Sequence, residues 1–178
     1  MNVFISGGCK NGKSHYAQRV ARKMADGLGK PLYYIATMIP RDSEDEARIA
    51  RHVEERRGWG FTTIEQGVRL TELLDDISVD KSGVFLLDSV TALLANEMFD
   101  AKGNMDRSAG KRVIRDLLEL ASRTGNTVFV SDYVYGDSQA YGETTELYRK
   151  SLAAADRALA ACCYRVVEIS YGIEEIWK

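Results

Sequence analysis

Near its amino terminus the chain reads Gly7-Gly8-Cys9-Lys10-Asn11-Gly12-Lys13-Ser14, directly after the apolar run Val3-Phe4-Ile5. This is the G-x-x-x-x-G-K-[ST] spacing of a phosphate-binding loop, and a helical stretch begins at His15. Glycine permits backbone conformations in which successive N–H groups turn inward on a phosphate. We expect Lys13 to reach the β- and γ-phosphates and the Ser14 hydroxyl to ligate Mg²⁺. The pattern therefore predicts that the chain binds a nucleoside triphosphate.

The composition is that of an ordinary globular protein. A length of 178 residues suits a single domain over residues 1–178, and a net charge of −2 gives no reason to expect nucleic acid as a partner. We expect no signal peptide and no membrane span, since no apolar run approaches the necessary length. Cys9, Cys162 and Cys163 lack metal-ligand spacing, which favours a reducing cytoplasm.

Strand and helix patterns alternate along the chain. We expect strands at 2–6, 32–36, 61–65, 84–88 and 127–132, and helices at 13–27, about 44–57, 70–74, 89–99, 107–123 and 143–162. Ser43 to Glu46 has the form of a capping box with Ser43 as the N-cap. Residues 165–170 and 174–177 suggest a hairpin about Tyr171-Gly172. The alternation predicts an α/β fold, a mainly parallel sheet with helices on both faces and an antiparallel C-terminal edge.

A second acidic position follows the apolar strand Val84-Phe85-Leu86-Leu87. P-loop enzymes carry such a strand beside the loop, and its terminal carboxylate holds Mg²⁺ directly or through water. Asp88 is therefore a candidate metal ligand together with Ser14. An N-cap for the next helix is the alternative, and Asp132, at the end of another strand, is a rival that would orient a substrate hydroxyl or cap a turn.

A histidine lies among basic residues on the expected helix 44–57. Arg48, His52 and Arg56 follow one another at intervals of four, so they share a face. Two guanidiniums nearby make protonation of the imidazole costly and attract phosphate oxygens. A neutral imidazole in that position is a nucleophile for phosphorus. The alternative is a solvated helix surface with ordinary ion pairs, such as Glu44 with Arg48.

With these features, the chain resembles the bifunctional adenosylcobinamide kinase / adenosylcobinamide-phosphate guanylyltransferase family of corrinoid (vitamin B12) synthesis. The similarity extends with small gaps over nearly the whole length and rests on the loop Gly7–Ser14, Tyr34-Ile35-Ala36-Thr37, Ala47-Arg48-Ile49-x-x-His52, Thr63-x-Glu65, Leu86-Leu87-Asp88-Ser89-Val90-Thr91 with Asn96 and Phe99, and Ser170-Tyr171-Gly172-Ile173. The loop alone is generic, whereas its combination with Ile-Ala-Thr and Arg-Ile-x-x-His is specific.

The resemblance implies an activity and the residues that perform it. His52 would match the histidine that this family guanylylates with GTP, before the corrinoid phosphate takes up the GMP. A kinase step using ATP or GTP would act on the aminopropanol hydroxyl of the corrinoid. Ala36 and Thr37 would lie at the nucleotide with Glu65, whose carboxylate suits the guanine edge. A RecA-like P-loop fold and a homotrimer are further implications.

The chain departs from the family pattern in its C-terminal half. Where the family shows Asn-Glu-Val-Gly, the chain reads Asp132-Tyr133-Val134-Tyr135-Gly136. Farther on, Phe-Arg-Asp followed by Gly and Asn-Gln becomes Tyr148-Arg149-Lys150, Ala153 and Asp156-Arg157. Asp88 replaces the more usual Glu, which keeps the charge and shortens the reach. Two alternatives therefore stay open: a P-loop kinase for another small hydroxyl compound without guanylyl transfer, and a diverged GTP-binding regulatory protein.

Overall fold

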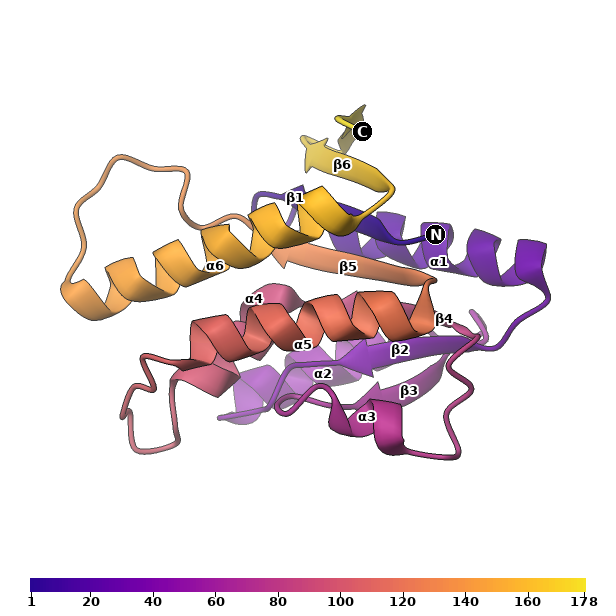
Figure 1. The fold of residues 1–178 in the computed structure, drawn as a ribbon, viewed down its shortest axis with the longest axis horizontal. Coiled ribbons are helices and arrows are strands. Elements are labelled where there is room, and N and C mark those ends of the chain that lie inside the picture. The colour runs from indigo at the N-terminus through magenta and orange to yellow at the C-terminus, as the bar shows by residue number, and fades with distance from the viewer.

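Seven strands form one sheet in the computed structural model, which describes residues 1–178, and helices cover both of its faces (Figure 1). The strand order is β3-β2-β4-β5-β1-β6-β7. All neighbours are parallel except β6 and β7. The strands are β1 (Val3–Gly7), β2 (Leu32–Ala36), β3 (Thr62–Glu65), β4 (Val84–Asp88), β5 (Thr127–Asp132), β6 (Arg165–Ser170) and β7 (Ile173–Ile176). The predicted α/β class, with its antiparallel C-terminal edge, is confirmed.

Two apolar clusters hold the helices to the sheet. Alternate residues of the buried strands serve opposite faces, so Val84 and Leu86 belong to one cluster while Phe85 and Leu87 belong to the other. The first cluster lies under α1; the second lies under α3, α4, α5 and α6. The helices are α1 (Lys13–Leu28), α2 (Ser43–Glu55), α3 (Glu72–Asp75), α4 (Val90–Met98), α5 (Ala109–Thr124) and α6 (Glu143–Cys162).

Helix α1 approaches the sheet closely because small side chains form its inner face. Ala17, Ala21 and Ala25 recur at intervals of four and are buried. This close approach fixes the start of α1, and with it the loop at residues 7–14, against the carboxyl end of β1. In parallel sheets, ligands bind at this edge.

Helix α2 differs from its neighbours because none of its residues is buried. It begins one residue earlier than predicted, at Ser43: the Asp42 carboxylate, not the Ser43 hydroxyl, accepts the N–H groups of Glu44 (3.0 Å) and Asp45 (2.9 Å). The prediction of Ser43 as N-cap is therefore wrong, because the neighbouring aspartate, an equally good cap, is the residue with extended backbone. Helix α2 is held mainly by its ends rather than by an apolar face.

The long connection 133–142 between β5 and α6 is fastened by one buried guanidinium. Arg149 donates to the carbonyls of Val134, Asp137 and Gln139, each at 3.2 Å, and pairs with the Asp137 carboxylate at 2.9 Å. Its guanidinium also lies 4.7 Å from the centroid of the Tyr141 ring. Because this connection follows directly after Asp132, Arg149 shapes the rim of the carboxyl edge.

We predict that Arg149→Lys loosens this connection while the core persists. Lysine keeps the charge but lacks the planar fork that reaches several acceptors at once. The loss of hydrogen bonds to a charged donor, about 1.5–3 kcal/mol each, should speed amide hydrogen exchange across residues 133–142. Exchange in β1 and β4 should stay near the wild-type rate, as it should everywhere in the matched exposed variant Lys150→Ala. Equal acceleration in β1 and β4 would contradict this assignment.

Candidate active site

The loop is seated where β1 ends between two parallel neighbours. An added Cβ at Gly7 would lie 2.4 Å from the Ile169 carbonyl oxygen of β6, so only glycine fits there. Gly12 has a φ of 86°, which favours glycine, and it precedes the first residue of α1. The first N–H group with a hydrogen-bond partner inside the helix is that of Tyr16, which donates to the Gly12 carbonyl at 3.0 Å. The preceding N–H groups are left free for an anion.

The start of α1 carries no negative charge of its own. It has no acidic side chain in its first turn and no side-chain cap. The helix dipole places partial positive charge at this end, and without a cap or acidic side chain that charge is not neutralised within the helix. An anion at the loop would therefore meet both free N–H groups and a favourable field.

The Lys13 side chain already points into this phosphate-binding loop. Its side chain is 5% exposed, and Nζ lies 2.6 Å from Asp132 Oδ1 and donates to the Gly8 carbonyl at 2.5 Å. Asp132 ends β5 directly beside Gly7 in the sheet register. The sequence predicts Asp132 only as a rival to Asp88, whereas the structure brings it into contact with the loop lysine.

Asp88 lies at the same edge, although β5 separates its strand from β1. Its strand β4 is therefore two positions from β1, and Asp88 reaches the loop edge from beyond β5. The alternative role as a helix cap falls to Ser89, whose side chain accepts the Ala92 N–H at 3.2 Å. The Asp88 carboxylate instead accepts the Tyr34 hydroxyl at 3.0 Å.

Tyr34 connects Asp88 to the end of α2. The Arg56 guanidinium lies 3.7 Å from the centroid of the Tyr34 ring and is 7% exposed. Burial and the neighbouring Asp88 carboxylate raise the pKa of Tyr34 well above its usual value, so its hydroxyl stays a donor. The expectation that Arg56 shares an open phosphate-binding face with His52 is not what the structure shows, because this side chain turns inward and stacks.

The Thr37 side chain is also used within the fold. It is fully buried, and its hydroxyl accepts the Ser89 N–H at 2.6 Å and donates to the Ser89 carbonyl at 2.9 Å. The expected contact of Thr37 with nucleotide is therefore replaced by a bridge that fixes the end of β4 after Asp88. Ala36 is half-buried beside Asp88 in the register.

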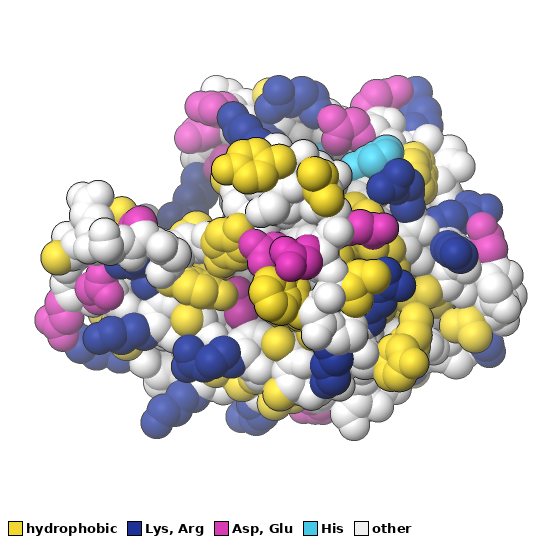
Figure 2. All heavy atoms as spheres, turned by 90° about the horizontal axis from the view of Figure 1, so that it is seen from above, with side chains coloured by type: hydrophobic (Ala, Val, Ile, Leu, Met, Phe, Trp, Pro, Cys, Tyr) yellow, Lys and Arg dark blue, Asp and Glu magenta, His cyan; other side chains and the backbone are white.

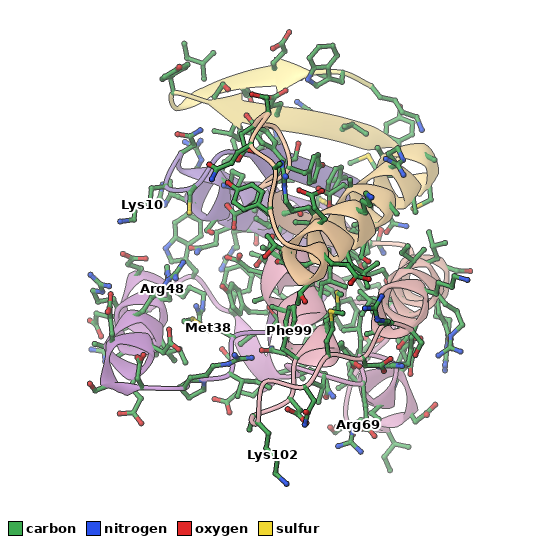
Figure 3. All side chains as sticks on the ribbon, turned by 90° about the vertical axis from the view of Figure 1, so that its left-hand side faces the viewer. Lys10, Met38, Arg48, Arg69, Phe99 and Lys102 are labelled. Atoms are coloured by element: carbon green, nitrogen blue, oxygen red, sulfur yellow. The ribbon has the colours of Figure 1, made fainter.

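Glu65 lies at the opposite end of the strand order from the hairpin, four positions from β1, and His52 lies on α2, outside the sheet. His52 Nδ1 lies 3.2 Å from Glu55 Oε2, and its ring is partly exposed. Glu65 is exposed at the end of β3, the edge strand. Figure 3 looks onto the carboxyl edge, with Lys10 of the loop above and Arg48 of α2 below on the same flank. The structure thus gathers Lys13, Ser14, Asp88 and Asp132 at one edge and leaves His52 on a separate helix.

In the sequence, Asp156 is noted only as a departure from the family pattern, and its burial is not predicted. Asp156 lies on the alanine-rich α6, 4% exposed, and its Oδ2 accepts the Tyr135 hydroxyl at 2.7 Å. Its other oxygen and the Ser131 hydroxyl have no partner of ordinary hydrogen-bond geometry. Burial raises the pKa of the Asp156 carboxyl to about 6, outweighing the lowering effect of the nearby Tyr135 and Ser131 hydroxyls.

We predict that Asp156→Asn stabilises the protein at alkaline pH. The folded-state pKa of about 6 lies above the usual unfolded value of about 3.9, so the contribution of this group is most favourable below pH 4 and is lost as the pH rises through 6. The expected loss in wild type is of the order of 2–3 kcal/mol. Urea unfolding at about pH 4.5 and about pH 8, one value on each side of this transition, measures the loss of stability.

The asparagine variant should show a flatter stability profile between these two conditions. Asp26→Asn, on the exposed surface of α1, is the control that should follow the wild-type profile. Parallel profiles for Asp156→Asn and wild type would show that this carboxyl stays ionised at no cost.

The fold and the loop define a P-loop NTPase. Two solved structures have a similar fold over most of the chain. The KaiC-like protein PH0186 of Pyrococcus horikoshii OT3 matches with a TM-score of 0.53 at 16% identity, over 94% of this chain and 69% of that one. The flagellar accessory protein FlaH of Methanocaldococcus jannaschii matches with a TM-score of 0.52 at 12% identity, over 99% and 77%. At these identities the likeness concerns the fold alone.

Residues 3–175 match the family described as cobinamide kinase / cobinamide phosphate guanyltransferase, and the chain belongs to that family. The bifunctional adenosylcobalamin biosynthesis protein CobP of Pseudomonas aeruginosa is 30% identical over 175 residues, 97% of this chain and 95% of that protein. The corresponding CobU of Escherichia coli K12 is 32% identical over 106 residues, 60% of this chain and 55% of that protein. The resemblance found in the sequence is thereby confirmed. No helix is both long and apolar enough to traverse a lipid bilayer.

Proposed function

We propose that the chain phosphorylates the aminopropanol hydroxyl of a cobinamide corrinoid and then transfers GMP from GTP to the resulting phosphate. The observation that carries this proposal is the buried Lys13 ammonium, aimed into a loop with free N–H groups, in a chain that belongs to the family. Both reactions need a triphosphate held by its phosphates, and this loop has the donors for that.

In the kinase step, the corrinoid hydroxyl oxygen attacks the γ-phosphorus of ATP or GTP, and the nucleoside diphosphate leaves. Phosphate binding draws Lys13 away from Asp132, because the triphosphate carries more charge than one carboxylate. Asp132 then lies free beside the γ-phosphate and accepts the proton of the attacking hydroxyl. The 2.6 Å contact between Lys13 and Asp132 supports this placement.

Mg²⁺ fits the residues at this edge. The Ser14 hydroxyl makes no hydrogen bond, and Asp88 keeps one carboxylate oxygen free while Tyr34 orients the other. No group of three His, Cys, Asp or Glu side chains converges here. Phosphate oxygens and water would therefore complete the coordination, as is usual for this ion, which neutralises charge on the phosphates when bound.

In the guanylyl step, an imidazole nitrogen of His52 attacks the α-phosphorus of GTP, forming a P–N bond as pyrophosphate leaves. A corrinoid phosphate oxygen then attacks the same phosphorus, and the P–N bond breaks. Arg48 would share the charge on the phosphates. Because no residue of α2 is buried, we propose that this helix moves to bring His52 to the loop.

A lone kinase is the second candidate, and the location of His52 on a helix separate from the loop favours it. Asp132 and Lys13 serve the kinase step without any movement of α2. A GTP-binding regulatory protein is the third, and it would bind GTP without turnover. We also propose a homotrimer in the cytoplasm: the exposed side chains of Ile173 and Ile176 on the edge strand β7, and of Trp177 directly after it, support assembly. Three unpaired cysteines support a reducing compartment.

We predict that His52→Ala abolishes covalent retention of GMP and leaves GTP binding intact. The imidazole is the proposed point of attachment, whereas the phosphates rest on the loop. Intact-mass spectrometry after incubation with GTP and Mg²⁺ measures the adduct. Arg51→Ala is the matched control, since it changes the exposed neighbour of His52 on α2 and should keep the adduct.

Two results would change the proposal. Retention of GMP by His52→Ala would place the nucleophile elsewhere. Absence of an adduct on the wild-type protein, together with phosphorylation of cobinamide, would leave the lone kinase.

A further inference from the structure

A hollow of about 350 Å³ opens between the start of α1 and the C-terminal hairpin. The size is within the usual range for a small-molecule pocket. Asn11, His15, Tyr16 and Arg19 line one wall, and Gly172 and Glu174 of the hairpin line the other. Figure 2 looks down on the side of the molecule that carries the C-terminal hairpin. It shows acidic and hydrophobic side chains gathered there, with Lys, Arg and His side chains beside them.

The hollow is continuous with the phosphate-binding loop. Asn11 and Gly12 belong to both, and the Asn11 amide donates to the Ile169 carbonyl at 3.4 Å, which ties the loop to the hairpin. A triphosphate on the loop would therefore have its nucleoside end within reach of the hollow.

The walls have the chemistry that a purine nucleoside needs. The Arg19 guanidinium lies 5.7 Å from the centroid of the Tyr16 ring, so a flat ring and a planar cation are available for stacking. Glu174 lies beside the Tyr16 hydroxyl, where burial and then the hydrogen bond to this carboxylate raise the pKa of Tyr16. A carboxylate accepts from base N–H groups and ribose hydroxyls but donates to neither.

Glu65, which the family resemblance suggested for the guanine edge, is poorly placed to contact the base of a nucleotide on the loop. Strand β3 is four positions from β1 in the sheet order. At about 4.8 Å per strand this is roughly 19 Å. Glu174, by contrast, is on β7, two positions from β1 on the other side, and pairs with Ile169 of the adjoining strand.

We propose that this hairpin hollow binds the purine base and ribose of the triphosphate whose phosphates lie on Gly7–Ser14. The inference rests on the proposed function for the presence of a triphosphate and adds where its nucleoside lies. Tyr16 and Arg19 stack on the base, and Glu174 accepts hydrogen bonds from it or from the ribose.

Isothermal titration calorimetry of the full chain with Mg²⁺-GTP and, separately, Mg²⁺-tripolyphosphate tests this. Tyr16→Leu and Glu174→Gln should each weaken GTP binding about tenfold, the effect of losing one good contact, while tripolyphosphate affinity stays within about twofold. Glu175→Gln is the matched control: it faces the opposite side of the same strand, beside Glu168, and should bind both ligands as wild type does.

The outcomes separate this inference from the proposed function. GTP affinity unchanged in both variants, or GTP and tripolyphosphate weakened equally, would overturn the hollow while leaving the loop in place. Equal affinity of wild type for the two ligands would do the same, because no contact to the nucleoside would remain. Failure of the wild-type chain to bind either ligand would overturn both proposals.

Discussion

The contact between the Lys13 ammonium and the Asp132 carboxylate is the interaction on which the rest of this site depends. It joins the loop after β1 to the end of β5, 2.6 Å apart, in a position where the lysine is almost fully buried. A buried ammonium needs a partner, and the carboxylate provides one until a phosphate replaces it. The lysine is thus kept in position for its ligand, and the aspartate is kept beside the place where a phosphoryl group would be transferred.

Strand order determines which other residues serve this position. Because β5 lies between β1 and β4, Asp88 reaches the same edge at one strand farther, oriented by Tyr34, which in turn stacks under Arg56. The end of α2 is therefore linked to the proposed metal ligand, while the body of α2, with His52, lies free of the core. This arrangement suits the two proposed reactions at one triphosphate site: the kinase residues are already in place, and the proposed guanylyl step would need α2 to approach.

Much of the fold was predictable because its signals are local. The apolar run 84–87 and the alanine-lined face of α1 follow directly from burial on two faces of a sheet. The glycines and turn residues of the loop and the hairpin are equally clear local signals in the sequence. The boundary at Asp42 was missed because two adjacent residues are both good caps, and only the backbone conformation decides between them.

The site was less predictable, because its residues come together only through tertiary structure. Lys13, Ser14 and Asp88 belong to motifs, whereas the role of Asp132 and the burial of Asp156 depend on the pairing of β5 with β1 and on the packing of α6. Helical spacing placed Arg56 beside His52, and the stacking on Tyr34 overrides that expectation. The family resemblance predicted a contact between Thr37 and the nucleotide, although the Thr37 hydroxyl is hydrogen-bonded to the backbone of Ser89.

The affinity of Lys13→Ala for Mg²⁺-GTP, measured by titration calorimetry beside the wild-type chain, tests the central claim most directly. Loss of a charge-assisted contact to phosphate should weaken binding by roughly tenfold to a hundredfold, with the fold intact by circular dichroism. Wild-type affinity in a folded Lys13→Ala variant would contradict the account, because the triphosphate would then be held somewhere other than the loop.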